Sequence, residues 1–127
     1  MSLNVLVTAG SRRVPLVRAF QRAVAQHRGG RVVVTDVNPL SPAVHAANRA
    51  YHVPLATEPG YIDTILAIAQ GEDVSLVVPT IDDELVLFGT ARDRFAAHGI
   101  HVAVSPAPTS ALCDDKHATC RFLLDRG

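Results

Sequence analysis

Residues 4–13 read Asn-Val-Leu-Val-Thr-Ala-Gly-Ser-Arg-Arg, and this stretch decides the fold. Its apolar run at residues 5–7 has no polar alternation, which is typical of a strand covered on both faces in a parallel sheet. Small residues and two arginines then break the run, and residues 14–26 repeat apolar side chains at helical spacing. We therefore expect a buried strand that passes through a tight turn into a helix. The backbone amides at the helix start, together with Arg12 and Arg13, would suit an anion.

The composition indicates one globular domain. The chain has 127 residues, of which 48% are hydrophobic and 19% are charged. Its formal net charge is zero, so we expect neither nucleic acid nor a membrane surface as partner. No apolar run has transmembrane length, and the first residues lack the pattern of a signal peptide. Two cysteines do not make a disulfide scaffold, so we expect a cytoplasmic protein.

Strand and helix patterns alternate along the rest of the chain. Apolar runs predict further strands over residues 32–35, 52–55, 74–78 and 101–105. Apolar spacing predicts a short helix over residues 43–49, longer helices over 62–71 and 85–95, and a last helix that Asp114 or Asp115 caps. Glycines end the first helix within 27–30 and the helix before residue 99. Pro54 lacks an amide donor, which places the third strand at or near an edge.

This order predicts an α/β fold, a Rossmann-like three-layer sandwich. Strand–helix repeats imply a five-stranded parallel sheet with helices on both faces. Right-handed crossovers favour the strand order 3-2-1-4-5. In such a sheet, ligands bind beyond the carboxyl ends of the strands where the winding reverses, here between the first and fourth strands.

Polar residues follow both of these strands. The residues that the two strand ends deliver are Gly10, Ser11, Arg12, Arg13, Pro79, Thr80, Asp82, Asp83 and Glu84. The basic residues after the first strand therefore face the acidic residues after the fourth strand across the crevice. This arrangement would suit a ligand carrying a carboxylate or phosphate as well as an amine. The alternative is that Asp82 and Asp83 cap the next helix and that both arginines are merely solvated.

Asp36 ends the second strand, where dinucleotide-binding folds keep an acid for the ribose. The Gly-x-Gly-x-x-Gly fingerprint is absent, however, and arginines fill the turn after Gly10, so we do not expect NAD. Capping of the turn at Asn38 is an equally good role for Asp36.

Cys113, His117 and Cys120 have a spacing that could place three metal ligands on one face of a continuous helix. A cap at residues 114–115 would break that helix, and no fourth ligand is evident, so we expect no metal site. The other histidines are scattered, and no Ser-His-Asp or Cys-His set can be assembled, so no catalytic residue is assigned.

Four segments resemble successive landmarks of one known domain. They are Val-Leu-Val-Thr-Ala-Gly-Ser-Arg-Arg-Val (5–14), Thr-Asp-Val-Asn-Pro-Leu-Ser-Pro-Ala (35–43), Val-Val-Pro-Thr-Ile-Asp-Asp-Glu-Leu (77–85) and Ala-Leu-Cys-Asp-Asp-Lys-His-Ala-Thr-Cys-Arg-Phe-Leu (111–123). In this order they resemble the N-terminal, pre-ATP-grasp domain of ATP-grasp ligases of the type labelled carbamoyl-phosphate synthase large-subunit-like. The resemblance covers essentially the whole chain.

The resemblance implies an ATP-dependent carboxylate–amine ligase. ATP and Mg²⁺ would bind the later lobes, a carboxylate would become an acyl phosphate, and an amine would attack it. The N-terminal domain would form the substrate side, with substrate contacts from Gly10, Ser11, Arg12, Arg13, Thr80, Asp82 and Glu84. Lys116 matches the family's lysine that reaches the nucleotide phosphates.

The same resemblance sets the expected domain boundaries. Residues 1–107 would be the pre-ATP-grasp domain, and residues 108–127 a helical linker to ATP-grasp lobes that lie beyond Gly127. The chain would then be an excised domain or a truncated product, without ligase activity and without a tightly bound cofactor. A homodimer is one expected partner arrangement, because apolar faces without the missing lobes could associate.

Two other classes of protein stay open. One is a self-standing module that binds a small anionic metabolite or nucleotide in the same crevice; the downstream coding sequence would separate it from the ligase. The weaker option is a receiver-type signalling domain. That domain needs an aspartate after its third strand and a lysine after its fifth, where this chain has Leu55 and Ser105.

Overall fold

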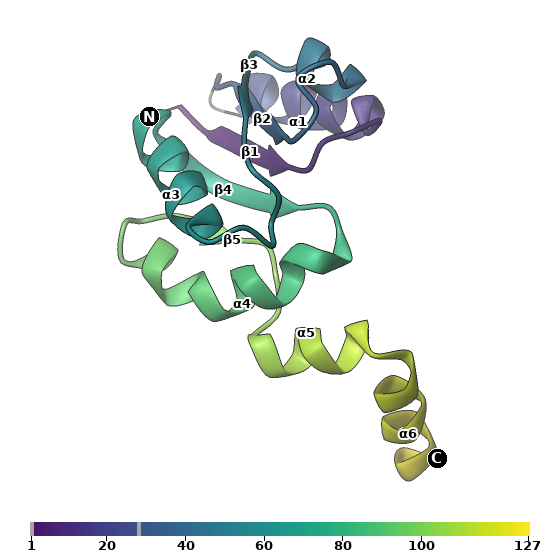
Figure 1. Cartoon of the computed structure of the whole chain (residues 1–127). Coiled ribbons are helices and arrows are strands. Elements are labelled where there is room, and N and C mark those ends of the chain that lie inside the picture. Colours follow the sequence, from purple (N-terminus) through teal and green to yellow (C-terminus); the bar gives the residue numbers. More distant parts are fainter. Residues whose placement is uncertain (1, 28) are drawn as a thin grey trace.

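The computed structural model describes residues 2–27 and 29–127 of the chain. Its strands are β1 (Asn4–Thr8), β2 (Val32–Asp36), β3 (Arg49–His52), β4 (Val74–Pro79) and β5 (His101–Val102). Its helices are α1 (Val14–His27), α2 (Pro42–Ala46), α3 (Tyr61–Gly71), α4 (Asp82–Ala96), α5 (Ala107–Asp114) and α6 (Lys116–Arg126). The strands pair in parallel in the order β3-β2-β1-β4-β5 (Figure 1). The predicted α/β fold and strand order are therefore confirmed.

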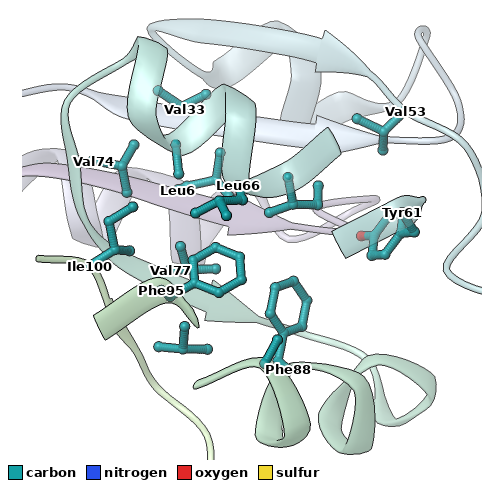
Figure 2. Packing of buried hydrophobic residues seen from close by; sticks show 14 residues of the cluster. Leu6, Val33, Val53, Tyr61, Leu66, Val74, Val77, Phe88, Phe95 and Ile100 are labelled. Atoms are coloured by element: carbon teal, nitrogen blue, oxygen red, sulfur yellow. The ribbon is translucent and has the colours of Figure 1, made fainter. Parts of the chain in front are cut away.

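Two apolar clusters lie on opposite faces of the sheet. The larger cluster joins Leu6 and Val77 of the sheet to α3 and α4, and Figure 2 shows it. Within it, the ring centroids of Phe88 and Phe95 are 5.8 Å apart. The other cluster packs alternate residues of β1 and β2 against Val17 of α1 and against α2. Every residue of β1 and β2 is buried, as expected of strands covered on both faces.

The third strand was predicted at the wrong place. It is Arg49–His52 rather than residues 52–55, and it occupies the predicted edge position beside β2. Three of its four residues are exposed, so it has no apolar run for a sequence pattern to reveal. The preceding helix ends at Ala46, because Asn48 begins the pairing: its amide donates to Val32 O and its side-chain oxygen accepts from Val32 N.

The fifth strand is also shorter than predicted, with two residues instead of five. The Ala103 amide still donates to Val77 O of β4. The Val104 amide then turns back to Val102 O, which takes the chain out of the sheet.

Glycines end two helices as predicted. Gly29 adopts a φ of 59° and its amide donates to Val24 O at the end of α1; the predicted helix stop also named Arg28, which lies outside the described residues. Gly99 adopts a φ of 74° after α4, and the next amide donates to Phe95 O. Both are left-handed caps, for which glycine has no steric penalty.

The last two helices extend from the α4 side of the sheet. Helix α5 packs against α4 at Gly89, where an added Cβ would lie 2.8 Å from Ala107 N. Asp115 separates the two helices and caps α6 as predicted, since its Oδ1 accepts from Ala118 N at 3.0 Å. Helix α6 buries no residue and points away from the sheet (Figure 1). Among the described residues, no helix has the length and hydrophobicity of a membrane span.

Candidate functional site

The turn after β1 is tightly packed against the end of β2. Ala9 and Ser11 both adopt left-handed backbone conformations, with φ of 51° and 47°. Between them, a Cβ on Gly10 would lie 2.7 Å from Val34 Cγ1 and 2.8 Å from Ala43 Cβ. Glycine is therefore required here by close packing.

Asp36 holds this turn in place from the end of β2. Its Oδ2 accepts a 2.7 Å hydrogen bond from Ser11 N, and its Oδ1 accepts from Asn38 N at 3.1 Å. Burial raises the pKa of Asp36, but the Asn38 amide, then the Ser41 side chain and the Ser11 amide, stabilise the charged form and keep the pKa below its ordinary value. The predicted capping of the turn at Asn38 is confirmed, and the same carboxylate also fixes the β1 turn.

Glu84 is a second buried carboxylate at the same end of the sheet. It lies in the first turn of α4 and is only 1% exposed. Its Oε2 accepts from Thr8 Oγ1 at 2.6 Å, and its Oε1 accepts from Tyr61 OH at 3.1 Å. Burial raises the pKa of Glu84, and the negative charges of Asp36 and Asp83 add to this effect.

Burial and the charge of Glu84 also raise the pKa of Tyr61, so its hydroxyl stays protonated as a donor. Within residues 2–27 and 29–127, no Lys, Arg or His forms an ion pair with Glu84.

A small, partly open cavity of about 80 Å³ is lined by both of these carboxylates. It is surrounded by segments that follow β1, β2, β3 and β4, so it sits at the carboxyl edge of the sheet, as the fold rule for ligand sites expects. Its lining residues are Ala9, Asp36, Val37, Val53, Pro54, Leu55, Ala56, Tyr61, Ile81 and Glu84.

A larger but more open groove of about 530 Å³ is lined by residues 56–63 and by residues of α4. Glu58, Asp83 and Leu87 line it, and an ion pair of 2.5 Å joins the exposed side chains of Asp63 and Arg94 across α3 and α4. Its charged side chains are exposed, whereas the small cavity borders the buried carboxylate of Glu84. Strongly perturbed buried groups mark functional sites more often than surface ion pairs do. We therefore take the cavity as the candidate site.

The family model described as PylC-like, N-terminal domain matches residues 5–103. The chain belongs to this family. The resemblance to a pre-ATP-grasp domain is thereby confirmed, while the finer label carbamoyl-phosphate synthase-like stays a prediction. No curated protein sequence matches the chain.

Solved structures of carboxylases share the fold of this PylC-like domain. One is the biotin carboxylase domain of a thermophilic 2-oxoglutarate carboxylase bound to ADP without magnesium, with 17% identity, a TM-score of 0.66, and coverage of 100% of this chain and 28% of that chain. A single-chain, multi-domain long-chain acyl-CoA carboxylase has 24% identity and a TM-score of 0.64. The match covers 97% of this chain and 13% of that chain. Rhizobium etli pyruvate carboxylase with the activator acetyl coenzyme A has 20% identity and a TM-score of 0.65. The match covers 100% of this chain and 12% of that chain. At these identities the likeness shows the fold, and the chain spans less than a third of each relative.

The PylC-like domain brings part of the predicted site together. Glu84 lines the cavity, and Thr80 braces it, since its Oγ1 donates to Thr8 O at 2.8 Å and to Ala9 O at 2.9 Å. Gly10 and Ser11 shape the adjoining turn. Substrate contact by any of these residues stays a prediction.

Other predicted residues lie outside the cavity lining. Arg12 and Arg13 are exposed in the β1–α1 turn, and Asp82 is exposed at the start of α4. Lys116 is exposed in the first turn of α6, whose main contacts are with α5. The contact between Lys116 and nucleotide phosphates stays a prediction.

Sequence reasoning missed Tyr61 and Thr8 as members of the site. Tyr61 begins α3 directly after a left-handed Gly60, and it is 4% exposed. A buried tyrosine requires a partner for its hydroxyl, which is the signal that could have drawn attention to it. That signal does not identify Glu84 as the partner, because the two residues are 23 positions apart.

The cysteine–histidine spacing does not form a common face. Cys113 belongs to α5, whereas His117 and Cys120 belong to α6, and the predicted break at Asp115 separates them. In the described part of the chain, no three His, Cys, Asp or Glu side chains gather in a way that could hold a metal ion.

Proposed function

We propose that this PylC-like domain is the substrate-side part of an ATP-dependent carboxylate–amine ligase of the carbamoyl-phosphate synthase-like type. In this reaction a carboxylate is phosphorylated to an acyl phosphate, and an amine displaces the phosphate. Two observations support the proposal: the family match over residues 5–103, and the shared fold with carboxylase domains described as bound to ADP. The chain covers less than a third of those relatives, so ATP and Mg²⁺ would bind lobes beyond the described residues.

The observation that carries a substrate role is the buried carboxylate of Glu84 at the cavity. A buried carboxylate without a counter-ion costs folding free energy that an apolar side chain would not cost. Such groups are retained most often where a ligand or a reaction uses them. The position at the carboxyl edge of a parallel sheet is also where ligands bind in this fold class.

The remaining predicted residues receive roles under the same proposal. Arg12 and Arg13 would attract the anionic part of a substrate, and the turn at Gly10 and Ser11 would fix their backbone. Thr80 would brace the turn, and Asp82 would border the crevice. Lys116 would reach the nucleotide phosphates once residues 108–127 have led into the ATP-grasp lobes.

The C-terminal helix fits this domain division. Phe122, Leu123 and Leu124 of α6 are exposed, at 37%, 61% and 74% of their surface. Apolar side chains in this number favour contact with a further surface, which we take to be the next lobe. A homodimer is the other arrangement that would cover them; one related biotin carboxylase domain, from Hydrogenobacter thermophilus, is described as a dimer in complex with MgADP and bicarbonate.

Calorimetry and a turnover assay test the proposal. The 127-residue chain should show no tight binding of Mg-ATP, because only Lys116 of the expected nucleotide site is present. The product of the complete reading frame should release ADP in a manner that depends on both a carboxylate and an amine. Low-micromolar Mg-ATP binding by the chain alone would contradict the proposal and favour a self-standing module for a small anionic metabolite or nucleotide.

A further inference from the structure

The cavity beside Glu84 combines apolar walls with acidic groups of one sign. Asp36 enters it from the end of β2 and Glu84 from the first turn of α4, and none of its other lining residues carries a positive charge. Neighbouring like charges in a dry site repel each other, and the charge of Asp36 is one of the causes that raise the pKa of Glu84. A positively charged ligand in the cavity would offset the repulsion between Asp36 and Glu84.

The hydrogen bonds at the cavity leave acceptor capacity on Glu84. Each carboxylate oxygen has room for two hydrogen bonds, and each Glu84 oxygen has one described donor. The donors Thr8 and Tyr61 are neutral hydroxyls, which do not neutralise the charge of Glu84. An ammonium group would supply charge-assisted hydrogen bonds, which are about twice as strong as neutral ones.

A neighbouring hydroxyl also lacks a partner. Thr35 pairs with Thr8 in the β1–β2 register, is fully buried, and its Oγ1 has no hydrogen-bond partner among the described residues. Buried hydroxyls in folded proteins are nearly always satisfied by protein groups or water. The polar groups at this end of the sheet are therefore not saturated by the chain itself.

The size and walls of the cavity limit the guest. A volume of about 80 Å³ is small beside the roughly 300–1,000 Å³ of most ligand pockets, so the cavity admits only one end of a ligand. Val37, Val53, Leu55 and Ile81 supply aliphatic walls. Of these, Val37 and Leu55 are 44% and 55% exposed, which places them at the mouth. Asp36 and Glu84 supply carboxylate oxygens, but Mg²⁺ keeps several waters in its octahedral shell, and the aliphatic walls would leave those waters without hydrogen-bond partners.

We propose that this cavity is the subsite for the amine substrate, taking a primary ammonium group on a short, branched aliphatic stem between Asp36 and Glu84. The inference rests on the proposed ligase function, and it names the class of the attacking amine. The ammonium end contacts the carboxylates, and the stem contacts the aliphatic walls. The carboxylate substrate would then bind outside this cavity.

The test titrates isobutylamine into the 127-residue chain at pH 7. Two-dimensional NMR of the backbone amides measures the binding. Isobutylammonium should bind and shift the amide resonances of Ala9, Val37 and Ala56. Isobutanol, which has the same shape without the charge, should bind about tenfold more weakly, and isobutyrate should not bind. Equal affinity for the alcohol and the amine would overturn the inference, because the site would then recognise shape alone.

Substitutions assign the effect to the carboxylate. Glu84→Gln should weaken isobutylammonium binding about tenfold or more, because the charge is lost while the size is kept. Asp93→Asn, the same change at an exposed position of α4, should leave the affinity unchanged. Tyr61→Phe removes one neutral donor and keeps the charge, so binding should persist. Thermal melts establish that each variant is folded.

The outcomes separate this inference from the proposed function. Unchanged amine affinity in a folded Glu84→Gln variant, or no binding to the natural chain, would overturn the amine subsite. The ligase proposal would still be judged by ADP release from the complete protein. Conversely, amine binding that depends on Glu84, with no turnover by the complete protein, would keep the cavity as an ammonium site and overturn the ligase proposal alone.

Discussion

The hydroxyl of Thr8 donates a 2.6 Å hydrogen bond to Oε2 of Glu84, which joins the end of β1 to the first turn of α4. Tyr61 of α3 donates to the other oxygen, so three elements fix one carboxylate. The carboxylate is also in the first turn of a helix, where the helix dipole favours negative charge. These contacts hold the acid in one orientation while burial raises its pKa.

Glu84→Gln should change how stability depends on pH. The pKa of Glu84 is raised above its ordinary value of 4.5, so the native state binds this proton more tightly than the unfolded chain does. Its contribution to stability is therefore complete below pH 4.5 and is lost as the pH rises through the native pKa. Glutamine does not ionise, so at pH 8 the variant should be more stable than the natural chain by on the order of 1 kcal/mol.

Urea unfolding between pH 4 and pH 8 measures this effect. The charged and titratable groups around Glu84 are Asp36, Asp83 and Tyr61, and all remain in the variant, so the difference between the two curves isolates Glu84. Asp93→Asn serves as the exposed control. Parallel curves for Glu84→Gln and the natural chain would show that the carboxylate is not perturbed.

Thr8→Val should destabilise the chain by about 1–3 kcal/mol, because Oε2 of Glu84 loses its only described donor while remaining buried. The same loss should raise the pKa of Glu84 further. Thr90→Val is the matched control, since the Thr90 hydroxyl is exposed and donates only to Val86 O of its own helix. Similar stability losses in both variants, measured by urea unfolding, would be at odds with the role given to Thr8.

Gly10→Ala should cost about 1–3 kcal/mol, because the new methyl would approach Val34 Cγ1 to 2.7 Å and Ala43 Cβ to 2.8 Å in a packed interior. Gly71→Ala, at the end of α3, meets nothing within 4 Å and should be neutral or slightly stabilising. Thermal melts of the two variants check the difference. A neutral Gly10→Ala would mean that the β1 turn relaxes without cost.

Replacement of both Arg12 and Arg13 by alanine should leave the melting temperature nearly unchanged. Both side chains are exposed, and exposed substitutions usually change stability by less than about 0.5 kcal/mol. A large drop would assign the pair a structural role. If the pair attracts the anionic substrate, the same change in the complete protein should raise KM for the carboxylate.

Glu72→Gln should show the opposite pH behaviour to Glu84→Gln. The Tyr51 hydroxyl donates to Glu72, and Arg31 forms a 2.8 Å ion pair with it. The Tyr51 hydrogen bond and then Arg31 lower the pKa of Glu72. Its contribution is present above the ordinary pKa and is lost as the pH falls through the lowered native pKa. The variant should therefore melt several degrees lower at pH 7 and lose less stability on acidification; equal melting temperatures at pH 7 would contradict this.

The central strands could be predicted because burial on both faces leaves an unbroken apolar run, as at residues 5–7. The edge strand Arg49–His52 could not be predicted in this way, because its side chains are largely exposed and only backbone pairing with β2 holds it. Capping by Asp36 and Asp115 was predictable, since both bonds span only two or three residues. The contact of Ser11 with Asp36 spans 25 residues and required the fold.

Local patterns in the sequence determined the parallel sheet, its order and the edge at which the polar residues gather, because hydrophobic periodicity and chain handedness act over short segments. They also determined the family, through short motifs in a fixed order. Only the tertiary structure decided that Thr8, Tyr61 and Glu84 meet and that Glu84 and Asp36 line one small cavity. The physical reason is that hydrogen bonding and desolvation depend on distances between side chains, which residues far apart in the sequence acquire only when the chain packs.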